Sequence, residues 1–196
     1  MPTYTPLQSI VLTSSASTVT LSNISQIYQD LVISVVSSTT ASTNADIYFR
    51  FNGDSGTNYS QTRIFSAYGN PSLTSDRSTN TTYIGGSWQP GLDSSPASYG
   101  ISYAQIFNYS NSTTFKTMIT SMDLSGSANK VVGKTVGTWR NKNSINSITL
   151  VSASGNISAG STIDIYGISP VAAQNASATG GTDIFYDSTY VYHVFK

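Results

Sequence analysis

The sequence contains no glutamate, and all nine of its acidic residues are aspartates. Nine lysines and arginines balance them, so the net charge is zero and only 9% of residues are charged, against a usual share of about 25%. Glu, Lys and Arg populate exposed helix faces, whereas Tyr, Thr, Val and Ile suit a pleated sheet. With thirteen tyrosines, and with Ser, Thr and Asn supplying 74 of 196 residues, the composition predicts an all-β protein.

The sequence also has no excess of charge of one sign and no long apolar run. The balanced charge does not favour nucleic acid or an anionic membrane as a partner. The most apolar stretch, Leu31 to Val36, is interrupted by Ser34 and is too short to span a bilayer. Residues 1–6 have neither the basic nor the apolar part of a secretion signal, so we expect a protein made in the cytoplasm.

Cysteine is absent, and His193 is the only histidine. The absence of cysteine excludes disulfides, thiolate metal sites and cysteine nucleophiles. The single histidine leaves His193 as the only possible base for a Ser-His-Asp arrangement. No Gly-x-Ser-x-Gly turn accompanies it. We therefore expect a non-enzymatic protein with no catalytic residues, no cofactor and no metal. A pair of aspartates acting as in glycoside hydrolases is the alternative.

Short segments of strand character recur along the chain, with turn residues between them. In Ala45–Phe51, apolar and polar residues alternate, while the run Leu31-Val32-Ile33 within Asp30–Ser37 predicts a strand covered on both faces. The remaining predicted strands are 10–12, 19–21, 59–68, 99–109, 115–122, 135–140, 146–151 and Thr162–Ile168. This pattern predicts an antiparallel two-sheet β-sandwich of the jelly-roll type.

Two segments interrupt the strand pattern. Residues 69–98 carry Gly and Pro late in their length and show no periodicity, so we expect a long loop within a sandwich domain that covers residues 1–169. Residues 170–196 begin with a linker rich in Ala, Ser, Asn and Gly and end in a segment of strand character. We expect them to form a C-terminal arm.

The segment 52–58 places oxygen side chains at alternate positions, at Asn52 and Asp54. A calcium loop would need a third ligand where Gly56 stands, and it would need an acidic closing residue. Asn-Gly and Asp-Ser-Gly are also strong turn sequences. We therefore predict a tight β-turn.

Exposed aromatic residues are the candidates for a contact site. Tyr83, Trp88, Tyr99 and Tyr103 could form a platform on which sugar rings stack, and Trp88 in the long loop is the strongest candidate. Tyrosine is also an ordinary strand residue, half-buried with its hydroxyl in water, so for most of them we favour packing in a core or an interface.

Several strings resemble a domain family that recurs in the virion proteins of tailed bacteriophages. The strings occur in order over residues 4–168, namely YTPLQSI (4–10), YQDLVI (28–33), FRFNGD (49–54), NYS (58–60), TWR (138–140), INSITL (145–150), SGN (154–156), AGS (159–161) and IYGI (165–168). In the arm, ATGG at 178–181 and YVYHVF at 190–195 resemble the junction at which longer fibre proteins continue into a Gly-rich segment.

This resemblance implies a structural protein on the surface of the virion, such as a capsid decoration protein or a tail-fibre module. Such proteins assemble symmetrically, for example as trimers, and their partners are other capsid or tail proteins. The arm residues Tyr190, Tyr192, His193 and Phe195 are the candidates for attachment to a neighbour's sheet edge. The alternative function is a module that adsorbs to a host receptor or a surface glycan.

Overall fold

The structure, a computed structural model, describes residues 4–67, 70–89, 99–125, 130–169, 183–186 and 191–194. Those residues contain strands, turns and bends but no helix, which confirms the all-β prediction. The strands are β1 (Tyr4–Val11), β2 (Thr18–Leu21), β3 (Asp30–Ser37), β4 (Ala45–Phe51), β5 (Tyr59–Ala67), β6 (Asn70–Thr81), β7 (Ile84–Gln89), β8 (Gly100–Phe107), β9 (Lys116–Ser125), β10 (Lys130–Trp139), β11 (Ile148–Ser152), β12 (Thr162–Ile168), β13 (Asp183–Tyr186) and β14 (Val191–Val194).

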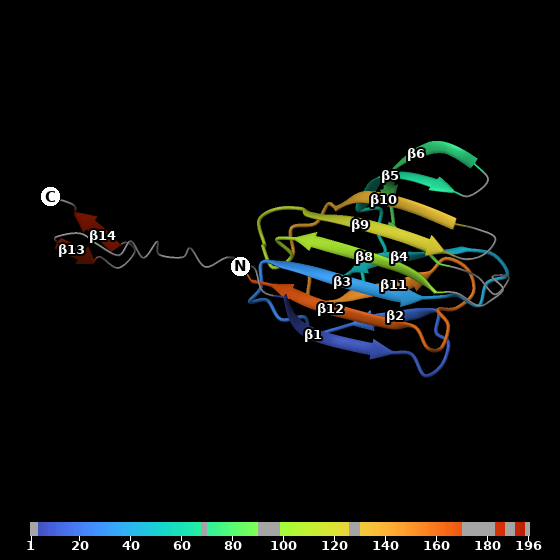
Figure 1. The fold of residues 1–196 in the computed structure, drawn as a ribbon, viewed down its shortest axis with the longest axis horizontal. Coiled ribbons are helices and arrows are strands. Elements are labelled where there is room, and N and C mark those ends of the chain that lie inside the picture. The colour runs from blue at the N-terminus through green and yellow to red at the C-terminus, as the bar shows by residue number, and fades with distance from the viewer. Residues whose placement is uncertain are drawn as a thin grey trace.

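Two antiparallel sheets face each other and form a β-sandwich, as predicted (Figure 1). The larger sheet has eight strands in the order β1-β12-β3-β8-β9-β10-β5-β6, and the smaller sheet has four in the order β2-β11-β4-β7. The chain passes repeatedly from one sheet to the other, as it does in jelly-roll sandwiches. The first strand, β1, pairs with β12, the last strand of the sandwich, so the two ends of the domain meet in one sheet.

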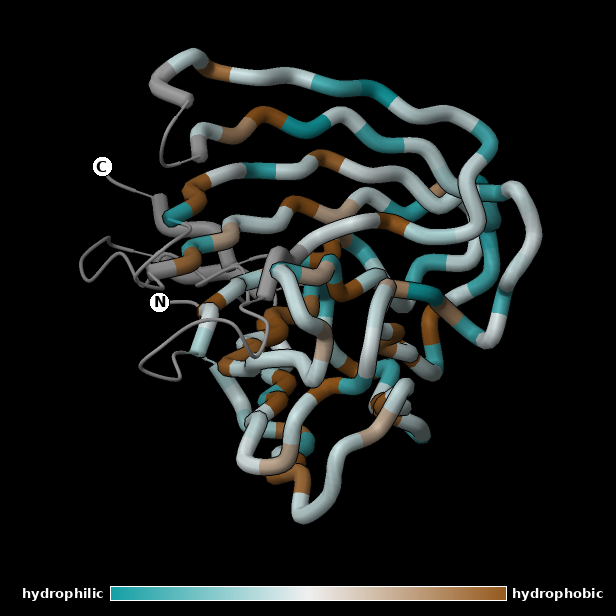
Figure 2. Tube along the Cα trace, turned by 90° about the vertical axis from the view of Figure 1, so that its right-hand side faces the viewer, coloured by the Kyte–Doolittle hydropathy of each residue, from teal (hydrophilic) through white to brown (hydrophobic). Residues whose placement is uncertain are grey.

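The core lies between the sheets because alternate side chains of each strand point inward. In β4, Ile47, Phe49 and Phe51 are fully buried while the residues between them are only half-buried. Hydrophobic positions accordingly gather in the interior of the sandwich, whereas the topmost strand, β6, is mostly hydrophilic or neutral (Figure 2). Burial of these alternating side chains supplies the main driving force for folding.

Strand β3 differs from its prediction, because only one of its faces is covered. Leu31, Ile33 and Val35 point into the core and are buried, whereas Val32 and Val36 are half-buried on the outer face of the larger sheet. A continuous apolar run therefore reflects, in this strand, an outer face that is itself partly apolar.

The long loop predicted for residues 69–98 is also wrong over most of its length. Its first part forms β6, a polar edge strand, and the next forms β7, which pairs with β4 at the edge of the smaller sheet. An edge strand with water on one side needs no apolar alternation, and the glycines of β7 hide its pattern. Residues 90–98 lie outside the described residues.

In the predicted arm, β13 and β14 pair with each other in a two-stranded sheet. The linker residues 170–182 lie outside the described part of the chain. The strand character expected at the C-terminus is thus confirmed over two four-residue strands.

Candidate functional site

Among the described residues, most of the large exposed apolar side chains lie on the larger sheet, on its outer face. This face is turned away from the smaller sheet and is open to water. Three of its apolar side chains are more than half exposed, since Tyr103 is 53% exposed, Val132 59% and Leu73 71%. Other large apolar residues of this sheet that are also exposed are Tyr4, Val11, Ile64, Ile101, Ile119 and Val136. A one-sided antiparallel sheet normally turns polar side chains to water, so this face is unusual.

Strand alternation explains why these residues lie there. In β8, Ser102, Ala104 and Ile106 are buried in the core, so Tyr103 between them must point outward. The same parity in β12 buries Ile163 and Ile165. It therefore turns Tyr166 to the outer face.

At one end of the outer face, three tyrosines from three strands border a hollow of about 400 Å³. Tyr4 comes from β1, Tyr166 from β12 and Tyr103 from β8, and Val32 and Ser34 of β3 complete the lining. These strands are neighbours in the order β1-β12-β3-β8, so the tyrosines lie across the strands. We call this hollow, together with the adjoining one, the tyrosine groove.

The adjoining hollow, of about 300 Å³, shares Tyr4, Val32 and Tyr103 with the first and extends it toward β9. It adds Ala104, Gln105, Phe107, Ile119 and Ser121. The Nε2 of Gln105 donates a hydrogen bond to Oδ2 of Asp30 at 3.2 Å, which orients the amide. All ten residues that line the tyrosine groove are uncharged.

A second hollow, farther along the same face, is mainly apolar and meets the tyrosine groove at Ser121. It measures about 380 Å³, and we call it the apolar hollow. Its residues come from β5, β6, β9 and β10, namely Ile64, Phe65, Ser66, Leu73, Ser121, Asp123, Val132, Gly133 and Lys134. Asp123 and Lys134 supply one charge of each sign in this lining.

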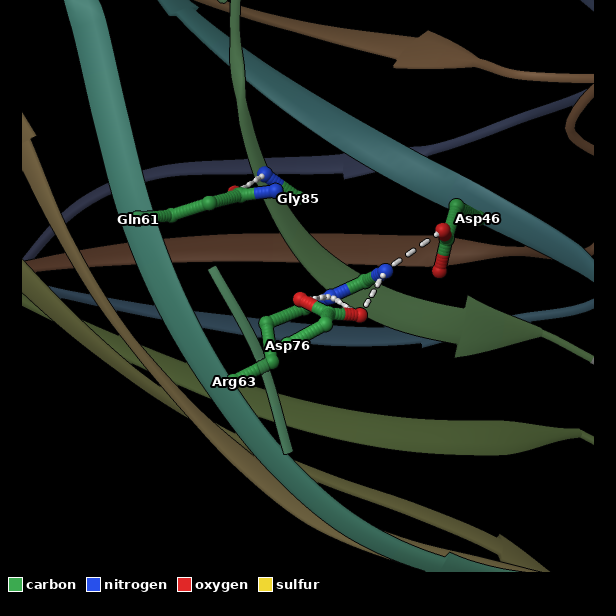
Figure 3. Close-up of polar contacts among 5 residues, drawn as sticks. All are labelled: Asp46, Gln61, Arg63, Asp76 and Gly85. Carbon is green, nitrogen blue, oxygen red and sulfur yellow. Dashed lines mark hydrogen bonds and ion pairs between the residues drawn. The ribbon is translucent and has the colours of Figure 1, made fainter. Parts of the chain in front are cut away.

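A half-buried polar cluster joins the two sheets at the edge formed by β7 (Figure 3). Arg63 of β5 donates from Nε to Oδ1 of Asp76 at 3.0 Å and from Nη2 to Oδ2 of Asp76 at 2.7 Å. Its Nη1 reaches across to Oδ2 of Asp46, on β4 of the smaller sheet, at 3.1 Å. Beside it, the backbone N–H of Gly85 donates to Oε1 of Gln61 at 2.6 Å.

The chemistry of this cluster is that of an ion-pair network. Burial raises the pKa of Asp46 to about 6, and Arg63 opposes this rise only in part. The hydrogen bonds that Arg63 donates to Asp76 are the largest cause of a raised pKa at Arg63, so the guanidinium stays charged. The structure thus brings two aspartates, Asp46 and Asp76, close to each other, but both accept hydrogen bonds from Arg63, which lies between them. This arrangement ties the sheets together, and Arg63 binds both oxygens of Asp76 and Oδ2 of Asp46.

Asp54 lies in a tight turn, as predicted. Asn52 and Gly53 both have positive φ, at 52° and 68°, and the Asp54 N–H donates to the carbonyl of Phe51. The Asp54 carboxylate accepts hydrogen bonds from Gly56 N, the Asn58 amide and, at 2.7 Å, Trp139 Nε1. Burial alone would raise the pKa of Asp54, but these hydrogen bonds hold it below its usual value.

The described residues show no contact between two members of the predicted aromatic platform. Tyr83 stacks on Tyr48, with ring centroids 3.6 Å apart, and β4 carries Tyr48 in the smaller sheet. Trp88 pairs with Asp46 in the β4–β7 ladder, and its side chain lies outside the described part. Tyr99 is exposed but is not among the residues that line the tyrosine groove, so Tyr103 is the member of the predicted set that lies in it.

The arm candidates can be placed only in part. Tyr192 and His193 belong to β14 and pair in register with Phe185 and Ile184 of β13. Tyr190 and Phe195 lie outside the described residues.

Sequence reasoning missed Tyr4 and Tyr166 as contact residues. The usable signal for Tyr166 was its position next to Ile163 and Ile165, which fixes its face once those isoleucines are assigned to the core. Tyr4 gave no such signal, because the register of β1 shifts between Pro6 and Gln8.

Comparison with known proteins assigns neither a family nor a function to this chain. No family model, curated protein or solved structure matches this chain. Within the ranges that the structure describes, no helix is long and apolar enough to cross a membrane. In those same ranges, no three His, Cys, Asp or Glu residues are grouped so that they could hold a metal ion. The surface described above is therefore the basis for a functional proposal.

Proposed function

We propose that this protein is a non-enzymatic structural component of the surface of a bacteriophage particle, either a capsid decoration protein or a tail-fibre module. It acts by symmetric assembly and by surface contact. The resemblance of strings along residues 4–168 supports the setting. The exposed apolar outer face of the larger sheet is the single observation that supports the mode of action.

The apolar hollow supports assembly through this face. Leu73, Val132 and Ile64 expose large aliphatic side chains around it, and burying them against another subunit would remove apolar area from water. Asp123 and Lys134 stand beside it with opposite charges, so copies related by symmetry could pair them. A sparsely charged surface rich in Ser, Thr and Asn also depends little on ionic strength, which suits a particle in changing media.

A second candidate function is a module that adsorbs to a host receptor or glycan. The tyrosine groove favours it, because three tyrosines border a shallow hollow whose lining also contains a serine hydroxyl. The two functions are compatible, because the two hollows share only Ser121 among their lining residues.

We expect the double substitution Leu73→Ser and Val132→Ser to weaken self-association by at least about tenfold, since two exposed aliphatic side chains are removed. Mass photometry and light scattering of the purified protein measure the oligomer. Ile27→Ser is the matched control, because Ile27 is 78% exposed but belongs to neither sheet. Equal self-association in both variants would contradict assembly through the apolar hollow.

The setting is tested by antibodies against the sandwich, applied to particles released from the producing cells. Electron microscopy should show regular labelling of a head or tail surface. Labelling of cell debris alone would overturn the virion proposal.

A further inference from the structure

We propose that the tyrosine groove is a binding site for a neutral oligosaccharide. This inference rests on the proposed surface-contact function and names the ligand of one end of that surface. It follows from three properties of the groove, which are its aromatic borders, the polar groups in its lining and its lack of charge.

The aromatic borders match the faces of sugar rings. A pyranose has a face of C–H bonds that packs on an aromatic ring, and its edge carries hydroxyl groups. Tyr4 is 63% exposed and Tyr103 53%, so both offer ring surface that the protein itself does not cover. A tyrosine that served only to pack the sandwich would be buried, as Tyr59 and Tyr109 are.

The polar groups of the groove match the sugar hydroxyls. Ser34 and Ser121 carry hydroxyl groups that can donate and accept, and Gln105 carries an amide that Asp30 orients. A few fixed polar groups on an otherwise apolar lining are typical of small-ligand sites. The apolar hollow has a mainly apolar lining, which is why we assign assembly to that hollow and recognition to the tyrosine groove.

Charge selects the class of oligosaccharide. None of the ten lining residues is charged, so the groove offers no cation to an acidic sugar, a sulfate or a phosphate. Two aspartates stand beside the lining, since Asp164 pairs with Ser34 and Asp30 accepts a hydrogen bond from Gln105, and both would repel an anion. Lys134 pairs with Ser121 at the β9 end, outside the lining of the groove. Uncharged sugars therefore fit the groove better than acidic ones.

The groove is long enough for more than one sugar ring. Its residues run from β1 to β9 across five adjacent strands, and neighbouring strands lie about 4.8 Å apart. The register places Tyr166, Val32, Gln105 and Ile119 in one row across four of these strands. We infer that the ligand is a chain segment that lies across the strands.

The test uses the full-length protein on a microarray of bacterial surface glycans that includes neutral and acidic oligosaccharides. We expect binding to neutral members. Calorimetric titration of a bound neutral oligosaccharide then compares variants. Tyr103→Ala and Tyr166→Ala should each weaken binding about tenfold, the loss of one aromatic contact, whereas Tyr103→Phe should stay within about threefold.

Tyr99→Ala is the matched control, because Tyr99 is exposed but does not line the groove, and it should bind as the wild type does. Ser34→Arg is a second variant that leaves every tyrosine in place, and its long side chain should fill the hollow and abolish binding. It keeps the inference testable if the alanine variants fold poorly. Circular dichroism checks each fold. Binding only to acidic glycans, binding to none, or binding that none of the groove substitutions changes would each overturn the inference.

This inference and the virion proposal fail separately. Normal labelling of particles without glycan binding would overturn the groove assignment alone. Glycan binding by a protein that no particle carries would overturn the virion role alone.

Discussion

At the scale of single residues, burial decides how the charged groups between the sheets behave. Asp46 has a side chain that is only 15% exposed, and its Oδ1 is buried with no hydrogen-bond partner among the described residues. Arg63 reaches only its Oδ2, while it binds Asp76 through two nitrogens. Burial therefore outweighs the attraction to Arg63 and raises the pKa of Asp46 to about 6.

This raised pKa predicts that the protein is more stable at pH 5 than at pH 7. The folded protein binds the Asp46 proton near pH 6, whereas the unfolded chain binds it near 3.8, so protonation favours the folded state as the pH falls through 6. We expect a gain in the free energy of unfolding of about 1 kcal/mol between pH 7 and pH 5. Urea denaturation at pH 5, 6 and 7 measures it.

Asp46→Asn is the control for this prediction, because it keeps every other titrating group, including His193. The variant should lose the gain between pH 7 and pH 5. The lowered pKa of Asp54 has its effect only below its usual value of 3.8, outside this window. A wild-type stability that is flat or rises toward pH 7 would show that Asp46 is charged at little cost.

At the scale of the elements, β7 shows how two adjacent glycines can serve different purposes. A Cβ at Gly86 would lie 2.8 Å from Cε2 of Phe49 and 2.9 Å from Cγ2 of Thr120, both in the core. A Cβ at Gly85 would meet only Gln61 and Arg63 side-chain atoms, at 3.4 Å or more. Only Gly86 is required by the packing between the sheets.

We expect Gly86→Ala to lower the free energy of unfolding by about 1–3 kcal/mol, the usual cost of overpacking a core. Gly85→Ala, one residue away in the same strand, should cost less than about 1 kcal/mol because its contacts are of ordinary length. Chemical denaturation of both variants measures the difference. Equal costs would mean that strand β7 shifts to relieve the contact at Gly86.

The same element shows what the sequence can and cannot predict. The bounds of β3, β4 and β12 follow from their apolar patterns and turn signals, because each buries a full row of side chains. Strands β6 and β7 were missed because they have no such row. Water satisfies the polar side chains of β6, and the need for space beside Phe49 leaves β7 with glycine where an apolar residue would have marked it.

At the scale of the whole molecule, the contact surface depends on strands that are distant in the sequence. Tyr4 and Tyr166 belong to the first and last strands of the sandwich, and Tyr103 comes from the middle of the chain. Alternation predicts the face of each tyrosine but not which strands become neighbours. Tyr103 was therefore predictable as a contact residue, whereas its partners depend on the sheet order β1-β12-β3-β8.

Sheet order also predicts that the sandwich folds without the arm. Strand β12 ends at Ile168 and is held on both sides, by β1 and by β3, while β13 and β14 pair with each other in a separate sheet. A chain ending at residue 169 therefore keeps both sheets and the tyrosine groove. We expect its thermal unfolding midpoint to lie within a few degrees of that of the full chain, because no described core residue is removed.

If the arm attaches the protein to a neighbour in the particle, as we propose, the same truncated chain should be incorporated at least about tenfold less, which corresponds to a loss of about 1.4 kcal/mol of binding free energy. Quantitative immunoblotting of purified particles measures incorporation, and calorimetry of the isolated protein measures folding. A folded truncated chain with normal incorporation would assign attachment to the outer face of the larger sheet and not to the arm. A truncated chain that fails to fold would contradict the independence of the sandwich, which the pairing of β12 with β1 and β3 requires.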